Sequence, residues 1–279
     1  MKIRNILLFL AIIFLCASGL KAETMTTNTV NEMPAGKKAT IHTSLGDIKV
    51  LLYDETPGHR DNFIKVAKDG VYDGTLFHRV IKDFMVQAGD PDSRTAAPGA
   101  QLGAGDLGYT QPAEIKFPKF YHKYGALSAA RTGDNVNPER RSSASQFYIV
   151  TGKKYTPAQL EMMQQRMADQ ERQPYFRNLC VKNKEEISRL QAANDREGLE
   201  TLRQKLIKET EANVGVSEYP ENIKQDYTTI GGTPHLDGQY TVFGEVLEGM
   251  DVVEKIQQAE TDGRDRPVED IRILSVEVE

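Results

Sequence analysis

The stretch Phe77–Asp90 reads FHRVIKDFMVQAGD. Its apolar residues are spaced as in β-strands, but His78, Arg79 and Gln87 interrupt the apolar pattern. Taken alone, an arginine in a strand is more often solvated or ion-paired than functional, and its apolar neighbours are more often core residues. The stretch therefore predicts strands, and it leaves open why a guanidinium lies two residues from a phenylalanine.

The segments on either side of this stretch also favour a β-rich domain. Alternating apolar residues surround Gly46-Asp47 in ATIHTSLGDIKVLLY and predict a hairpin. The following TPGHRDNFIKVAKDG predicts a helix, because Thr56 can act as N-cap, Pro57 suits the first turn and Gly70 suits the C-terminal end. Short strand-like runs continue to residue 156 and resume from residue 228. Residues 37–156 and 228–279 therefore predict one mainly β domain with a flanking helix.

Residues 157–227 have a different pattern, which is helical. Leu160, Met163 and Met167 recur at i, i+3 and i+7, and a second stripe follows near residues 199–206. Charged residues are dense around both stripes, so each helix is expected to bury only a narrow face. The sequence thus predicts a helical block inserted into a β domain.

The N-terminal residues 1–22 have the features of a secretory signal peptide: basic residues, a short apolar run and then small residues. Cleavage after Ala22 changes the formal net charge from −5 to −8, because three basic and no acidic side chains are removed. That charge disfavours nucleic acid as a partner. Residues 23–36 are expected to be a flexible spacer. The mature protein is expected to be soluble and periplasmic or secreted, not a lipoprotein, and without an intrachain disulfide, since only Cys180 remains.

Three blocks together, FHRVIKDFMVQAGD, SSASQFYIV and PHLDGQYTVFGEVLEGMDVVEKI, resemble the cyclophilin family of peptidyl-prolyl cis-trans isomerases. The resemblance covers about residues 37–156 and 228–279. It implies a closed eight-stranded antiparallel barrel, capped by helices and filled by side chains, with the substrate groove on its outer face.

The resemblance also implies the site residues. Arg79 and Gln87 are implied as the catalytic pair: the first would donate to the prolyl nitrogen in the transition state, and the second would hold a peptide carbonyl. The implied substrate-binding residues are Phe84, Met85, Tyr148 and Leu236 around the proline, and His78, Ala130, Gln146, His235 and Tyr240 along the groove.

Several of these positions have other interpretations or depart from the family pattern. Gln146 could equally satisfy backbone groups of a loop, and His78 is expected to pack and bond within its strand. His235, Arg131 and Tyr240 stand where tryptophan, asparagine and histidine are frequent, and Tyr148 adds a hydroxyl to a frequent phenylalanine. These departures put substrate preference and cyclosporin binding in question.

Rotation about an X-Pro bond breaks no covalent bond, so the resemblance implies neither a nucleophile nor a cofactor. The other histidines lack the spacing of a metal site, and LGAGDLG lacks the spacing of a phosphate loop. The expected partners are proline-containing peptides and unfolded protein clients of a monomer. The alternative to an isomerase is a binding module or holdase that recognises proline segments with little turnover, for example with a helical lid over the groove.

Two roles remain open for the inserted helices. They could pack against the barrel and stabilise it, or they could extend the substrate surface through exposed Met162, Met163, Tyr175 and Phe176.

Overall fold

The computed structural model describes residues 34–215 and 218–279. The expected signal peptide, residues 1–22, and residues 23–33 of the expected spacer lie outside the described residues. Among the described helices, none combines the length and the apolar character that a membrane crossing requires.

The first elements follow from local sequence. Strands β1 (Gly36–Thr43) and β2 (Gly46–Tyr53) form the predicted hairpin, but the turn lies at residues 44–45 and Gly46-Asp47 begin β2. Helix α1 (Pro57–Lys68) begins after Thr56, but the Thr56 side chain makes no capping bond. Instead, the Glu114 carboxylate accepts from the backbone N–H groups of Gly58 (3.1 Å) and His59 (2.9 Å). A carboxylate that is distant in sequence therefore caps the helix, and it suits the partial positive charge of a helix N-terminus.

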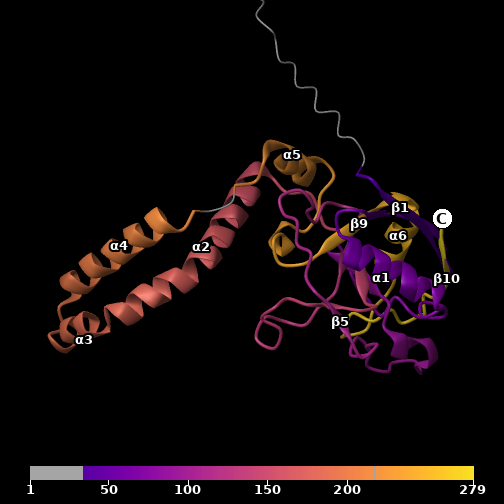
Figure 1. Cartoon of the computed structure of the whole chain (residues 1–279), viewed down its shortest axis with the longest axis horizontal. Helices are drawn as coiled ribbons and strands as arrows, with labels where there is room; N and C mark the ends of the chain where they lie inside the picture. Colours follow the sequence, from indigo (N-terminus) through magenta and orange to yellow (C-terminus); the bar gives the residue numbers. More distant parts are fainter. Residues whose placement is uncertain (1–33, 216–217) are drawn as a thin grey trace, which may run out of the picture. The chain divides into compact units, whose positions relative to one another are not determined.

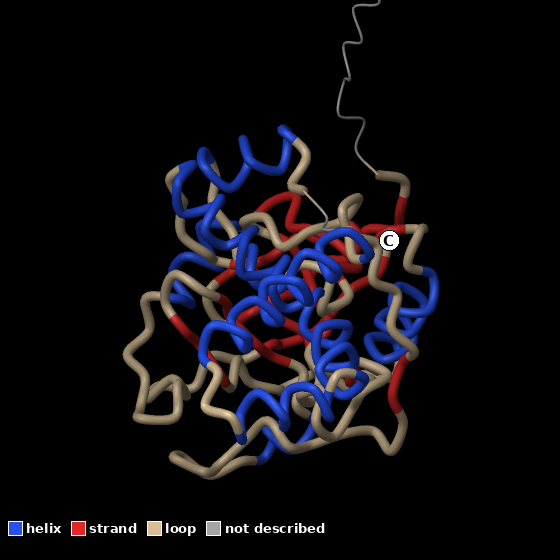
Figure 2. The backbone as a smooth tube through the Cα atoms, turned by 90° about the vertical axis from the view of Figure 1, so that its left-hand side faces the viewer, coloured by secondary structure: helices blue, strands red, loops and turns tan. Residues whose placement is uncertain are grey.

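Eight strands pair antiparallel in one curled sheet, in the order β10-β1-β2-β9-β6-β8-β4-β3. Figure 1 labels β1, β9 and β10, and Figure 2 shows the strands in red among the helices and loops. The remaining six are β3 (Arg79–Ile81), β4 (Met85–Ala88), β6 (Ala126–Ala129), β8 (Phe147–Val150), β9 (Val242–Glu248) and β10 (Ile273–Val278). The register shifts along β2–β9, β6–β9 and β1–β10, and such bulges bend strands. Strands β5 (Thr110–Gln111) and β7 (Ser142–Ser143) form a separate pair.

The expected closed barrel is not supported, since the sheet is a curled half-barrel whose edge strands are β3 and β10. Near the starts of these two strands, an isolated bridge between Leu76 and Arg272 and three backbone hydrogen bonds join residues 74–77 to residues 271–273. No ladder develops there because β3 has only three residues and the Val80 N–H donates to the Asp265 carbonyl (2.7 Å) in a loop.

The two faces of the sheet have different roles. On β4 and β8, Val86, Ala88, Phe147 and Ile149 alternate into the main core, which α1 and α6 (Met250–Gln257) also line. Met85, Tyr148 and Val150 of the same strands face the other way and join a second apolar cluster. Because side chains alternate along a strand, this second face is where the groove can form.

The inserted segment contains α2 (Pro157–Lys182), α3 (Lys184–Ala192), α4 (Arg196–Asn213) and α5 (Glu221–Thr229). Thr156 and Gln159 form a capping box at the start of α2. Helices α2 and α4 lie side by side (Figure 1), with Arg172 Nη1 3.7 Å from Glu211 Oε1. The narrow stripes are confirmed, with Leu160 and Leu206 buried. Cys180 lies on α2 as a partly buried free thiol.

The expectation of four exposed side chains for client binding is wrong in part. Met162 is 57% exposed, but Met163, Tyr175 and Phe176 are partly buried. Met163 packs against a cluster formed by Tyr155, Leu160, Tyr219, Ile223 and Tyr227.

Two short 3-10 helices complete the described elements. The first, η1, spans Pro91–Thr95, and the second, η2, spans Pro234–Leu236. The second carries two of the predicted site residues.

Candidate active site

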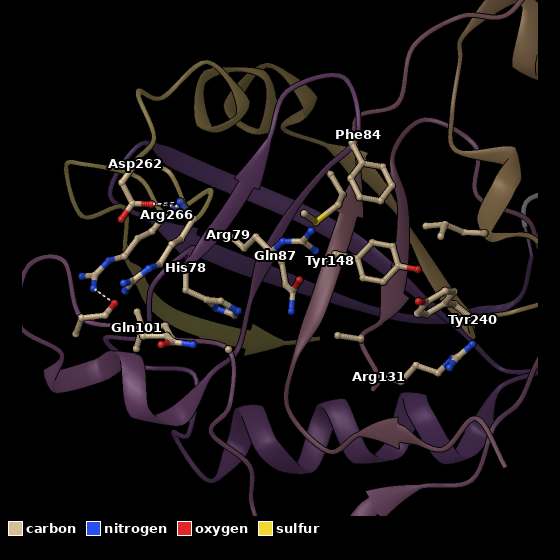
Figure 3. A pocket seen from close by; sticks show the side chains of 17 residues that line it. His78, Arg79, Phe84, Gln87, Gln101, Arg131, Tyr148, Tyr240, Asp262 and Arg266 are labelled. Carbon is tan, nitrogen blue, oxygen red and sulfur yellow. Dashed lines mark hydrogen bonds between the residues drawn. The ribbon is translucent and has the colours of Figure 1, made fainter. Parts of the chain in front are cut away.

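A pocket of about 400 Å³ lies on the outer face of β3, β4 and β8 (Figure 3). Nine of the eleven residues implied by the resemblance line it: His78, Arg79, Phe84, Met85, Gln87, Ala130, Tyr148, Leu236 and Tyr240. Figure 3 shows Arg79 and Gln87 between an aromatic side, with Phe84, Tyr148 and Tyr240, and a polar side, with Gln101, Asp262 and Arg266. Gln146 and His235 stand outside the lining.

Arg79 and Gln87 lie together because β3 and β4 pair with these residues opposite each other. The Arg79 side chain is 43% exposed, and its Nε lies 3.5 Å from Oδ2 of Asp265. At this distance and exposure the ion pair is weak, which leaves guanidinium donors for a ligand. The pairing thus places a permanent charge and an amide at the open side of the pocket.

Gln146 lies behind the pocket wall and is 6% exposed. Its Oε1 accepts from Gln87 Nε2 (3.0 Å), and its Nε2 donates to the carbonyls of Gly103 (3.1 Å) and Gly105 (2.8 Å). The structure therefore supports the interpretation that Gln146 satisfies loop backbone groups. The same bonds hold the Gln87 amide in place.

The apolar side of the pocket is formed by buried Met85 and Tyr148 with partly buried Phe84 and Leu236. The Tyr148 and Tyr240 rings meet edge to face, with centroids 6.1 Å apart. An apolar pocket with a rigid aromatic wall suits a compact ring such as that of proline.

Two departures from the family pattern pack against each other. The Arg131 guanidinium lies 4.4 Å from the Tyr240 ring centroid, a cation–π distance. Arg131 Nη1 also pairs with Asp134 Oδ1 (2.7 Å), and its Nε donates to the Gln239 carbonyl (3.0 Å). Arg131 therefore lines the pocket as the support of Tyr240.

The two predicted histidines lie in different places. His78 lines the pocket and is buried, and its backbone N–H donates to the Gln87 carbonyl (3.0 Å) of the neighbouring strand. Burial lowers the pKa of His78. The His235 ring stacks on the Phe84 ring, with the two centroids 5.4 Å apart, and it is not part of the pocket lining. Burial lowers the pKa of His235 as well. Both imidazoles are therefore biased toward the neutral form.

Sequence reasoning missed the polar side of the pocket, formed by residues 100–103 with Asp262, Arg264 and Arg266. Arg266 is buried, and its Nη1 donates to the carbonyls of Ala97 (3.1 Å) and Ala100 (2.6 Å). It thereby holds residues 97–100, which lead into the pocket wall. The segment RDRPVED shows only charges in the sequence, and nothing in it indicates which distant carbonyls the arginine binds.

Sequence reasoning also set His122 aside as one of several scattered histidines. In the structure its Nε2 lies 3.0 Å from the Tyr148 hydroxyl, and its Nδ1 lies 2.9 Å from Asp237 Oδ1. Among the residues that the structure describes, no group of three or more His, Cys, Asp or Glu side chains suits a metal ion.

The fold is that of the cyclophilins. A solved cyclophilin-type peptidyl-prolyl cis-trans isomerase from Cryptosporidium parvum matches with a TM-score of 0.51 and 19% identity, over 88% of this chain and 98% of that chain. The family model "Cyclophilin type peptidyl-prolyl cis-trans isomerase/CLD" matches residues 38–278, so the chain belongs to this family.

Curated relatives agree with this assignment. A protein of Staphylococcus saprophyticus named as a peptidyl-prolyl cis-trans isomerase is 33% identical over 243 residues, 86% of this chain and 91% of the relative. A Staphylococcus aureus protein of the same name is 30% identical over 244 residues, 87% and 91% of the two chains. A Streptococcus pyogenes protein named as a bifunctional phosphatase/peptidyl-prolyl cis-trans isomerase is 32% identical over 251 residues, 88% of this chain and 40% of that protein. Peptidyl-prolyl cis-trans isomerisation is the activity that these matches support.

Proposed function

We propose that the pocket binds the proline of an X-Pro segment against Phe84, Met85, Tyr148 and Leu236, with Arg79 catalysing rotation and Gln87 holding the peptide. The observation that carries this proposal is the placement of a guanidinium and an amide on paired strands at the open side of an apolar pocket. Polar donors and an apolar wall thus converge on a space that suits a proline and its preceding peptide bond.

The chemistry needs little more than this arrangement. The planar amide resists rotation by about 18–20 kcal/mol because resonance is lost, and the prolyl nitrogen regains a lone pair as the bond twists. A donor that hydrogen-bonds to this lone pair only in the twisted state lowers the barrier to rotation, because it stabilises the transition state and not the planar ground state. Arg79 suits this role because it stays charged and presents several donors in a fixed plane. Gln87 would hold one side of the bond while the other rotates.

The alternative of a binding module with little turnover has less support. A helical lid over the groove would favour it, but the pocket lining includes no described residue from α2 to α5. An accessible pocket with available donors favours turnover.

Catalysed cis-trans exchange of an Ala-Pro peptide, measured by NMR, tests the mechanism. Arg79→Ala should lower kcat/KM about 10²- to 10³-fold, the effect of removing one preorganised transition-state donor. Arg79→Lys should recover little, since it keeps the charge and loses the planar fork. Arg203→Ala, which removes an exposed arginine of α4, is the matched control. Equal rates for Arg79→Ala and the control would refute the role of Arg79.

We further propose that the substrates are proteins folding outside the cytoplasm. The support is the signal-like sequence of residues 1–22. Fractionation of cells that produce the full chain, compared with a chain lacking residues 2–22, tests this location. A cytoplasmic full-length protein would contradict it.

A further inference from the structure

A buried line of hydrogen bonds runs from the floor of the pocket to the inserted helices. The Tyr148 hydroxyl lies 3.0 Å from His122 Nε2, and His122 Nδ1 lies 2.9 Å from Asp237 Oδ1. Asp237 Oδ2 accepts from the hydroxyl of Tyr227 (2.6 Å), a residue of α5. None of the four residues is more than 4% exposed. The pocket and the insertion are thus joined through polar groups that are shielded from water.

The chemistry of each group determines which atom donates and which accepts in each hydrogen bond of this line. An ionised carboxylate only accepts, so His122 Nδ1 donates to Asp237 and the Nε2 lone pair accepts from Tyr148. Asp237 Oδ1 also accepts from the His122 backbone N–H (2.9 Å). Burial raises the pKa of both the Tyr148 and Tyr227 hydroxyls well above the usual value, so both remain O–H donors. Three donors converge on one buried carboxylate, which suits the need of a buried charge for hydrogen bonds.

Asp237 acts on two walls of the pocket. It follows Leu236 directly at the end of η2, so fixing its carboxylate also restrains that apolar residue. Through His122 it fixes the hydroxyl end of Tyr148, whose ring meets Tyr240. The position of Asp237 therefore affects Leu236 and Tyr148, two of the four side chains proposed to hold the proline.

Helix α5 is built to present Tyr227 at this point. The Tyr121 hydroxyl donates to Asp226, the Tyr219 hydroxyl donates to the Pro234 carbonyl (2.9 Å), and the Tyr227 ring packs against both tyrosines. The backbone of Gly232 passes between His122 and Tyr227, where a Cβ would lie 2.3 Å from the His122 carbonyl oxygen and 2.5 Å from a Tyr227 ring carbon. Close backbone approach thus brings the helix against the His122 segment.

We propose that Tyr227 is a positioning residue of the isomerase, through which the inserted helices set the geometry of the proline pocket. The proposal rests on the placement of proline described above. It gives the insertion a role in catalysis that requires neither contact with substrate nor a lid.

Tyr227→Phe removes only the hydroxyl and tests the proposal in the full chain. The expected result is a loss of about three- to tenfold in kcat/KM for the Ala-Pro peptide, corresponding to one lost hydrogen bond. In a Tyr148→Phe background the further loss should be smaller than in the wild type, because one of the two routes from Asp237 to the pocket is already broken. Long-range ¹H–¹⁵N NMR should show changed His122 ring signals in Tyr227→Phe.

Tyr124→Phe is the matched control, since it removes a tyrosine–carboxylate bond to Glu254 of α6, outside the buried line that joins Tyr148 to Tyr227. It should leave kcat/KM and the His122 signals unchanged. Unchanged kcat/KM in Tyr227→Phe, equal losses in the two variants, or a full loss in the Tyr148→Phe background would each overturn the proposal. Arg79→Ala in the same assay reports on the proposed mechanism separately, so a loss there with none in Tyr227→Phe overturns only the positioning role.

Discussion

The substitution Gln146→Met tests whether Gln146 contacts the substrate or instead holds the side chain of Gln87 in place. The substitution keeps the length of the side chain and removes three hydrogen bonds: one to Gln87 and two to the loop carbonyls of Gly103 and Gly105. The sequence resemblance placed Gln146 against the substrate. The structure places it one layer behind, so the two interpretations predict different results.

The expected loss of stability depends on which of the groups that lose a hydrogen bond can bind water instead. Gly103 is exposed and the Gln87 amide is partly exposed, so water can replace the bonds that these groups lose. Gly105 is buried, and an unsatisfied buried carbonyl costs about 1–3 kcal/mol. For a chain of this size that loss lowers Tm by roughly 3–9 °C. Release of the Gln87 amide should lower kcat/KM about tenfold, the equivalent of about 1.4 kcal/mol in the transition state.

The assay combines thermal unfolding with catalysed exchange for Gln146→Met, Gln87→Met and the double variant. If Gln146 acts through Gln87, adding Gln146→Met to Gln87→Met should lower Tm further and leave kcat/KM unchanged. Additive losses in kcat/KM would refute the reasoning and return Gln146 to direct contact with the substrate. Activity within twofold of wild type in Gln146→Met alone would show that Gln87 needs no support.

Two further predictions concern stability. Burial raises the pKa of the Glu114 carboxyl, but hydrogen bonds from the His59 side chain and the first amides of α1 outweigh it and leave that pKa below 4.5. Its contribution is therefore complete above pH 4.5 and is lost as the pH falls below that value, so urea unfolding of Glu114→Gln should show a shallower acid decline than wild type. Gly232→Ala should lower the free energy of unfolding by more than about 2 kcal/mol, because the added Cβ meets the His122 carbonyl oxygen at 2.3 Å in a backbone conformation with φ 151°. A Gly232→Ala variant as stable as the wild type would show that α5 can move away from the His122 segment without loss of stability.

Much of the local structure could be predicted from short stretches. The hairpin of β1 and β2, the start of α1 after Thr56 and the narrow buried stripe of α2 depend on neighbouring residues and on period. The block FHRVIKDFMVQAGD contains both β3 and β4, and the pairing of these two strands brings Arg79 beside Gln87. The position of the arginine therefore depends on residues that are close in sequence. The sequence by itself therefore determined the family, the face of the groove and nine residues of the pocket.

Tertiary structure decided the features that depend on distant partners. The sheet does not close between β3 and β10, where the Val80 N–H bonds the Asp265 carbonyl of a loop instead. Gln146 supports Gln87 because two glycine carbonyls lie beside it. Arg131 supports Tyr240, and Tyr227 reaches Tyr148 through His122 and Asp237. A buried polar side chain must bond whatever the folded chain places around it, and a linear pattern does not encode those neighbours.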